Sequence, residues 1–202
     1  DTPWTRDAAI NTWNGAGLLF PEVTRSTLLS VLERDGNVVR IGGQYWDAII
    51  WTVGAWAQYL YTGDRSFLEL ALDATRNSLA HLEATEFSAD RGLFRGPACY
   101  GDGVAAYPDV YARTDGSSSI LDWPAANPGL VAEPGYGIPM HALSTNCLYA
   151  HAYRLADTMA RELGLADRLA NALRLPRQPE PARPVAVRLN PPAADNVPPP
   201  RR

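Results

Sequence analysis

Lysine is absent from the chain, and all 18 basic residues are arginine. These arginines are interspersed with 22 acidic residues and the net charge is −4, so no basic patch of the kind that binds nucleic acid is present. Cysteine is almost as scarce, because Cys99 and Cys147 are the only two, too few for a disulfide framework. We expect two free, buried thiols, and a bridge between them is the alternative.

Long apolar runs are also lacking. The most apolar stretch, residues 46–61, is interrupted by Asp47, Gly54 and Gln58 and falls short of the ~20 residues of a membrane span. We therefore expect no membrane association. No signal peptide is recognisable, and because the chain starts at Asp1 we expect an upstream segment; the sequence does not indicate a compartment.

Several well-known site motifs are missing. The chain has no Gly-x-Ser-x-Gly elbow, P-loop or dinucleotide fingerprint, which argues against serine hydrolases, NTPases and Rossmann enzymes. The three histidines, His81, His141 and His151, show no metal-ligand spacing with the cysteines. We expect neither a metal nor a cofactor.

What the chain does have is apolar helical periodicity, with 46% apolar residues to form a core. A short helix is expected within residues 4–14. A second helix is expected to begin at Pro21 and to end at Asp35-Gly36. Its apolar face comprises Val23, Leu28, Leu29, Val31 and Leu32. A buried helix over 46–61 and an amphipathic helix over 66–85, separated by Thr62-Gly63-Asp64, predict a helical hairpin. The last clear helix is expected over 141–163.

Two segments are not helical in pattern. Residues 86–139 are rich in Gly, Pro, Ser and Asp but also in aromatics, which favours a long functional loop over disorder. From Pro176 onward nine of 27 residues are proline, which predicts a disordered tail. We therefore expect one domain over residues 1–173 and a tail over 174–202. The predicted fold class is all-α, a partial (α/α)6 toroid of helical hairpins.

Residues 95–109 of the long loop carry the strongest candidate for chemistry. Asp102 stands between Gly101 and Gly103, which leave it free to point into a cleft, and Tyr100 could shield it and raise its pKa. Glycoside hydrolysis requires one protonated carboxylic acid together with a second carboxylate, so Asp102 is the predicted general acid. The alternative is a Gly-Asp-Gly turn without chemistry.

Further candidates lie at the expected helix starts. Trp4, Arg6 and Asp7 combine an indole, a guanidinium and a carboxylate, which suits a sugar ring; a first-turn carboxylate facing the helix dipole is the alternative for Asp7. Asp47 follows Trp46 and lies one turn before Trp51, and the alternative is an ion pair with Arg6 or Arg40. We interpret Trp4, Arg6, Asp7, Trp46, Asp47 and Trp51 as substrate contacts. In Ser144-Thr145-Asn146 we favour helix capping, with Asn146 as a hydroxyl partner in the cleft as the second interpretation.

In these stretches the sequence resembles the six-hairpin (α/α)-barrel glycoside hydrolases, the group of trehalase-like, glucosidase-like and debranching-like enzymes. The resembling stretches span residues 4–164: Trp4-Thr-Arg-Asp7, Trp46-Asp47, Trp51-Thr-Val-Gly-Ala-Trp56, Thr62-Gly63-Asp64, Gly92-Leu-Phe-Arg95-Gly96-Pro97, Asp102-Gly103 and Leu143-Ser-Thr-Asn146. The resemblance implies sugar-binding roles for Asp7, Asp47, Trp51 and Arg95, and an acid at Asp102. In such enzymes the catalytic base usually comes from the later half of the barrel, to which nothing here corresponds.

The expected function is therefore hydrolysis of O-glycosidic bonds of an oligo- or polysaccharide by carboxylate acid/base catalysis. Two alternatives remain open: a sugar epimerase or unsaturated-uronyl hydrolase on the same barrel, which needs a histidine pair such as His141 and His151, and a non-catalytic carbohydrate-binding remnant. A complete barrel needs roughly 350–450 residues. We thus expect part of a barrel, with an apolar seam through which the chain self-associates.

Overall fold

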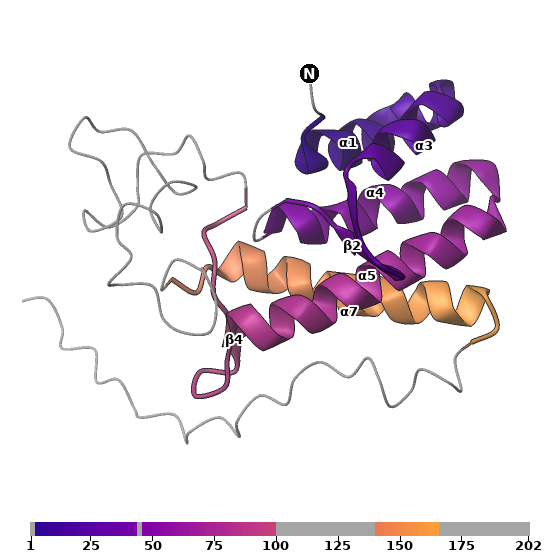
Figure 1. Ribbon diagram of the computed structural model, residues 1–202. Helices are drawn as coiled ribbons and strands as arrows, with labels where there is room; N and C mark the ends of the chain where they lie inside the picture. The colour runs from indigo at the N-terminus through magenta and orange to yellow at the C-terminus, as the bar shows by residue number, and fades with distance from the viewer. Residues whose placement is uncertain (1–2, 44–45, 100–139, 166–202) are drawn as a thin grey trace, which may run out of the picture.

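The computed structural model describes residues 3–43, 46–99 and 140–165, with the side chain of Trp46 also left aside. This part is mainly α-helical (Figure 1), which confirms the coarse fold class. Its longest helices are α4 (Trp46–Thr62), α5 (Arg65–Glu86) and α7 (Leu143–Glu162), and each of the three contacts the other two. None of the described helices is long and apolar enough to cross a membrane.

The N-terminal part forms a second helical hairpin that packs on α4. It begins with α1 (Thr5–Asn11), which continues through a π-helical stretch, Thr12–Ala16, into α2 (Gly17–Leu19) and returns as α3 (Pro21–Ser30). The chain leaves helical geometry at Gly15, so the first helical run ends at this glycine and a short second run reaches Leu19. Gly15 takes a φ of 117° inside the π-helical stretch, a conformation that glycine adopts without strain.

Close approach of α1 to α4 depends on Gly54. A Cβ atom at this position would lie 2.6 Å from the Cα of Ala9, closer than two carbon atoms can approach. Both glycine and alanine are therefore needed where these two helices touch, and Ala9 is fully buried there.

The segment after α3 forms a β-hairpin, which the sequence interpretation missed. Strands β1 (Leu32–Asp35) and β2 (Val38–Ile41) pair antiparallel, with Leu32 opposite Ile41, around a turn at Gly36 and Asn37. The helix opened by Pro21 thus ends at Ser30, and Val23, predicted on its apolar face, is 64% exposed. Gly-Asn, the dipeptide that forms this two-residue turn, is a known hairpin signal, and here it outweighs helical periodicity.

Strand β2 is held against α5 by apolar and polar contacts. Val39 and Ile41 are buried, the side-chain amide of Asn77 donates to the carbonyl of Val39 (2.9 Å), and the backbone N–H of Ile41 donates to the hydroxyl of Ser78 (2.8 Å). The polar side chains of α5 therefore satisfy backbone groups on the strand edge that faces the helix.

A second, shorter hairpin follows α5. Strands β3 (Phe87–Ser88) and β4 (Leu93–Phe94) pair antiparallel, and the ring of Phe94 stacks face to face on Tyr149 of α7, with centroids 3.7 Å apart. This hairpin begins the segment predicted as a long loop. The rest of that segment and the proline-rich tail lie largely outside the described residues.

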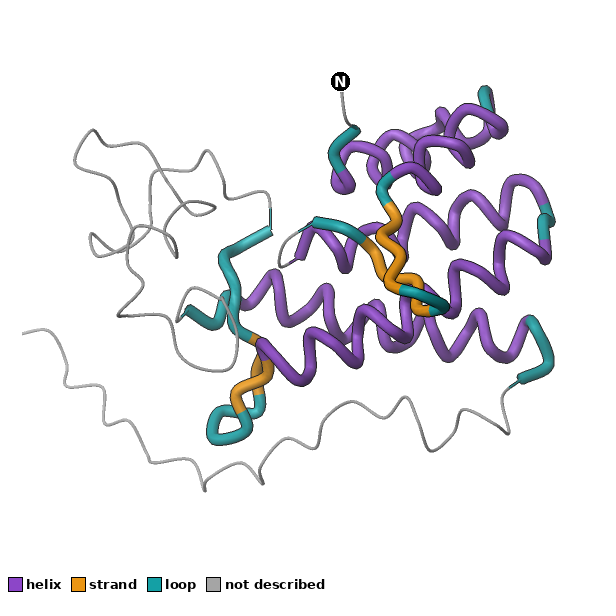
Figure 2. The backbone as a smooth tube through the Cα atoms, in the orientation of Figure 1, coloured by secondary structure: helices purple, strands orange, loops and turns teal. Residues whose placement is uncertain are grey.

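The helices alternate in direction. At one end of the molecule the hydroxyl of Thr5 in α1 donates to the carbonyl of Gly42, just before α4 (2.9 Å). At the other end the hydroxyl of Tyr59 in α4 donates to Glu162 in α7 (2.7 Å). Helices α1, α4 and α7 therefore start at the same end, and α3 and α5 run back between them, as the tube in Figure 2 shows.

Candidate functional site

The end of the molecule where α1, α4 and α7 start holds most of the predicted site residues that the structure describes. Trp4 precedes α1, Arg6 and Asp7 lie in its first turn, Asp47 lies in the first turn of α4 and Asn146 in that of α7. The last residue of α5 and the segment after β4 reach the same end (Figure 1). We call this region the helix-start end.

The starts of α1 and α4 are joined through Gly43. A Cβ atom at Gly43 would lie 3.2 Å from the hydroxyl of Thr5 and 3.4 Å from the Cβ of Asp47. Gly43 also takes a φ of 106°, which side-chain-bearing residues rarely adopt. The Gly42-Gly43 segment is thus the point where the first turns of α1 and α4 are brought together.

Asp7 and Asp47 differ in environment. The side chain of Asp7 is 62% exposed, and its carboxylate lies 3.9 Å from the guanidinium of Arg6. Asp47 is buried with only 9% of its surface exposed, and its charge helps to raise the pKa of the Cys99 thiol, after the larger effect of burial. One carboxylate is therefore open to solvent and the other is sheltered, although both start neighbouring helices.

Arg95, predicted to contact a substrate, is instead engaged by the end of α5. Its guanidinium lies 3.8 Å from the carboxylate of Glu86 and donates to the carbonyl of Thr85, while its backbone N–H donates to the carbonyl of Glu86 (2.8 Å). The side chains of Arg95 and Glu86 are 11% and 7% exposed. Because it is nearly buried among these partners, the guanidinium has a structural role in fixing the turn after α5.

The polar residues that open α7 do not cap it, contrary to expectation. The N-cap is Ala142, which makes no side-chain cap. The hydroxyl of Ser144 instead accepts from the backbone N–H of Cys99 (3.0 Å), and the hydroxyl of Thr145 donates to the carbonyl of Pro97. These side chains bind the segment after β4 to the first turn of α7.

Asn146 completes this attachment. Its side-chain oxygen accepts from the backbone N–H of Phe94 (2.8 Å), and its side-chain nitrogen donates to the carbonyls of Phe94 (3.0 Å) and Ala142 (2.9 Å). Both amide protons are thereby used, which leaves Asn146 without a donor for a sugar hydroxyl. The structure thus gives Asn146 the role of a clamp on β4.

The predicted tryptophans fall into different environments. Trp4 is 60% exposed next to α1, so its ring is open to a planar ligand. Trp51 is fully buried, packs near Phe67 with ring centroids 6.4 Å apart, and donates its indole N–H to the carbonyl of Leu28 (3.0 Å). Trp51 is a core residue whose ring has no face open to a sugar. The side chain of Trp46, and Tyr100 and Asp102 entirely, lie outside the described residues.

The histidines do not meet. His151 is exposed on α7, whereas His141 precedes that helix and its backbone bridges Gly96. Burial lowers the pKa of His141, with Arg91 and Arg95 adding to the effect, so its imidazole is neutral at pH 7. His81 is exposed on α5. Both cysteines are free, as expected, but Cys147 is exposed and Cys99 half-buried, so neither thiol is fully buried.

Two groups at the helix-start end were missed from the sequence. Glu86 is a buried acid at the C-terminus of α5, where the helix dipole disfavours negative charge. Tyr149 is buried in α7, and its hydroxyl has no hydrogen-bond partner among the described residues. Burial raises its pKa well above the usual value, and Glu86, Tyr153 and Cys99 add to the effect. Of these two residues, only Glu86 could have been noticed in the sequence, because a carboxylate at the C-terminal end of a helix is unfavourable.

The protein is mainly α-helical. Its helix-start end holds carboxylates, exposed and buried aromatic rings, and the buried ion pair between Glu86 and Arg95. Comparison with known proteins adds nothing to this description: no family model, no curated protein and no solved structure matches the chain.

Proposed function

We propose that the chain is a sector of an (α/α)6 toroid with the activity of a glycoside hydrolase on an oligo- or polysaccharide. The observation that carries the proposal is the common starting end of α1, α4 and α7, with Asp7 and Asp47 on first turns that touch through Gly43. In a barrel of helical hairpins, one set of parallel helices forms the inner ring and the returning helices form the outer ring.

The packing order supports the toroid. Helix α4 contacts α1 on one side and α7 on the other, so these three form a row of parallel helices. The returning helices α3 and α5 pack against that row, α3 on α1 and α4, and α5 on α4 and α7. Continuing this alternation around an axis would produce a closed ring of hairpins.

The chemistry at the helix-start end supports a carbohydrate ligand. The exposed ring of Trp4 suits stacking on a sugar face, and the neighbouring carboxylate of Asp7 suits hydrogen bonds from sugar hydroxyls. Asp47 contributes a sheltered carboxylate beside them. Asp102, on the segment that follows Cys99, remains the proposed general acid, in accordance with the resemblance given above.

Glycosidase activity is best tested on the full chain with a panel of aryl glycosides and oligosaccharides, by measuring released reducing sugar. We expect turnover that Asp102→Asn abolishes and Asp7→Asn weakens, whereas Asp73→Asn, an exposed carboxylate on α5, leaves it unchanged. Circular dichroism of each variant confirms folding. Sugar binding by calorimetry without any turnover would favour the non-catalytic carbohydrate-binding alternative, and absence of both would refute the proposal.

A further inference from the structure

The end opposite the helix-start end carries a concentration of exposed apolar side chains. It comprises the corner between α2 and α3 and the end of α4, at the right of Figure 1. Seven large apolar side chains there are 40–70% exposed, and we call them the tip surface: Trp13, Leu18, Leu19, Phe20, Val23, Leu60 and Tyr61. Among the described residues, the other exposed large apolar side chains are scattered singly.

The tip surface is continuous across the two helical hairpins. The hydroxyl of Tyr61 donates to the carbonyl of Trp13 (3.2 Å), and the backbone of Gly17 packs so closely on the Tyr61 ring that a Cβ there would lie 2.8 Å from it. The ends of α2 and α4 therefore touch, and their exposed side chains form one surface rather than two.

The size of the tip surface matches what a stable protein interface needs. Its exposed fractions add up to about four whole residues, or roughly 800 Å² at about 200 Å² each. A standard interface buries about 800 Å² per partner, while a typical monomer rarely exposes a patch this large.

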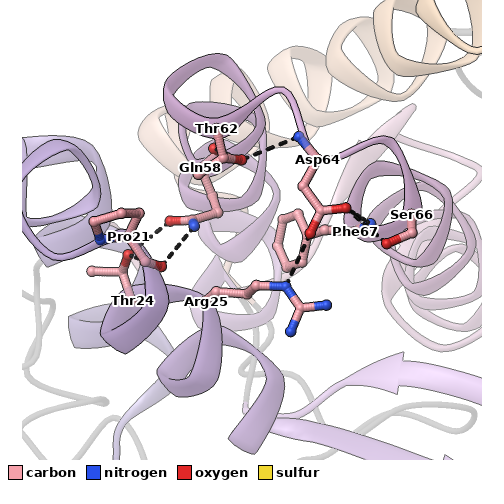
Figure 3. A network of polar contacts seen from close by, with 8 residues as sticks. All are labelled: Pro21, Thr24, Arg25, Gln58, Thr62, Asp64, Ser66 and Phe67. Atoms are coloured by element: carbon pink, nitrogen blue, oxygen red, sulfur yellow. Dashed lines mark hydrogen bonds and ion pairs between the residues drawn. The ribbon is translucent and has the colours of Figure 1, made fainter.

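Two ion pairs lie at the rim of the tip surface, and the exposed carboxylate of Glu22 lies beside Val23. The guanidinium of Arg25 in α3 donates to the carboxylate of Asp64 at 3.1 Å (Figure 3), and Arg65 lies 3.7 Å from the carboxylate of Glu162. Two copies of such a surface can face each other without repulsion between unpaired cations. The same pairing leaves these arginines poorly suited to attract the anionic surface of a membrane.

We propose that the tip surface is the interface of a homodimer, in which α2, α3 and the end of α4 meet the same elements of a second copy about a two-fold axis. Such an isologous contact requires a surface that is complementary to itself, which an apolar patch whose rim arginines are already paired provides. The proposal is independent of the glycosidase activity, because the tip surface lies at the opposite end from the candidate site.

The test is the mass of the full chain in solution, measured by light scattering after gel filtration and by sedimentation over a concentration series. The variants are Leu19→Glu and Phe20→Gln, two side chains without described polar roles, whose change leaves the backbone bonds of this corner intact. The matched control is Leu143→Glu, which places the same charge at an exposed leucine of the helix-start end.

We expect a mass approaching twice 22.0 kDa for the wild type and for Leu143→Glu, and a monomer for the two tip variants with an unchanged circular dichroism spectrum. A wild type that stays monomeric at all concentrations would refute the proposal. So would a dimer that persists in both tip variants, or binding to neutral lipid vesicles by a chain that remains monomeric.

Discussion

Replacing Asp64 tests the network that joins α3, α4 and α5 (Figure 3). Asp64 is the N-cap of α5: its carboxylate accepts from the backbone N–H of Phe67 (3.0 Å) and the hydroxyl of Ser66 (2.7 Å), and also from Arg25. Loss of an N-cap costs about 1 kcal/mol, and loss of the partly exposed ion pair and the hydroxyl contact adds about another 1 kcal/mol. We therefore expect Asp64→Ala to lower the free energy of unfolding by about 2 kcal/mol.

Thermal and urea unfolding followed by circular dichroism measure this effect. For a chain of this size the loss corresponds to a decrease in Tm of roughly 4–8 °C. Asp64→Asn keeps a good capping side chain and should cost only about 0.5 kcal/mol, whereas Asp73→Ala, on the exposed face of α5, should change almost nothing. Equal losses in Asp64→Ala and Asp73→Ala would refute the capping argument, and equal losses in the Ala and Asn variants would attribute the effect to charge alone.

The same carboxylate predicts a dependence on pH. Its hydrogen bond from Phe67, then those from Ser66 and Arg25, hold the pKa of Asp64 below its ordinary value of 3.8. Because the folded-state pKa is the lower one, this stabilisation is complete above the ordinary value and is lost as the pH falls through the folded-state value. The stability difference between the wild type and Asp64→Asn should therefore persist at neutral pH and shrink in acid. A difference that grew in acid would contradict this reasoning.

Three further outcomes are expected. Asn146→Ala should cost about 2–3 kcal/mol, because it removes the clamp on Phe94 and leaves buried backbone groups without partners. Asn146→Asp should cost at least as much, because its carboxylate keeps the acceptor but sets a negative charge against the carbonyls of Phe94 and Ala142; urea unfolding compares the two. Gly54→Ala should cost about 1–3 kcal/mol through overpacking against Ala9, and a neutral result would contradict the close contact of α1 and α4. Ultraviolet titration should show Tyr149 protonated well above pH 10, so stability should fall as alkaline pH ionises this phenol in the unfolded chain only; Tyr149→Phe should lessen that fall.

Much of the helical framework could be predicted from the sequence. Apolar periodicity placed the helix that starts at Trp46 and the one that follows Thr62-Gly63-Asp64 within one or two residues of their observed bounds. Such agreement is expected where a helix is long and one face is buried, because the 3.6-residue period is then sampled several times. The β-hairpin at Leu32–Ile41 was missed because Val31 and Leu32 also fit the preceding helical period.

The roles of polar side chains were harder to predict than the helices that bear them. Arg95 and Asn146 have the residue types that hold sugars, yet in the structure they bind the backbone at Thr85 and Phe94. Sequence pattern places such a residue on an element, but it does not say whether a neighbouring strand leaves peptide groups that need partners. Where a chain turns sharply beside a helix, as it does after β4, those peptide groups compete with any ligand for the same donors and acceptors.

Side-chain hydrogen bonds fix the backbone at both ends of the helical bundle. At the helix-start end, the bonds of Ser144, Thr145 and Asn146 fix residues 94–99, so the segment that leads to Asp102 departs from a rigid base. At the tip, Gln58 is fully buried between the carbonyl of Pro21 and the hydroxyl of Thr24, which holds the apolar corner in place (Figure 3). Because a rigid surface loses less conformational entropy when it binds, the order at both ends supports the proposals of a ligand at the first and another copy of the chain at the second.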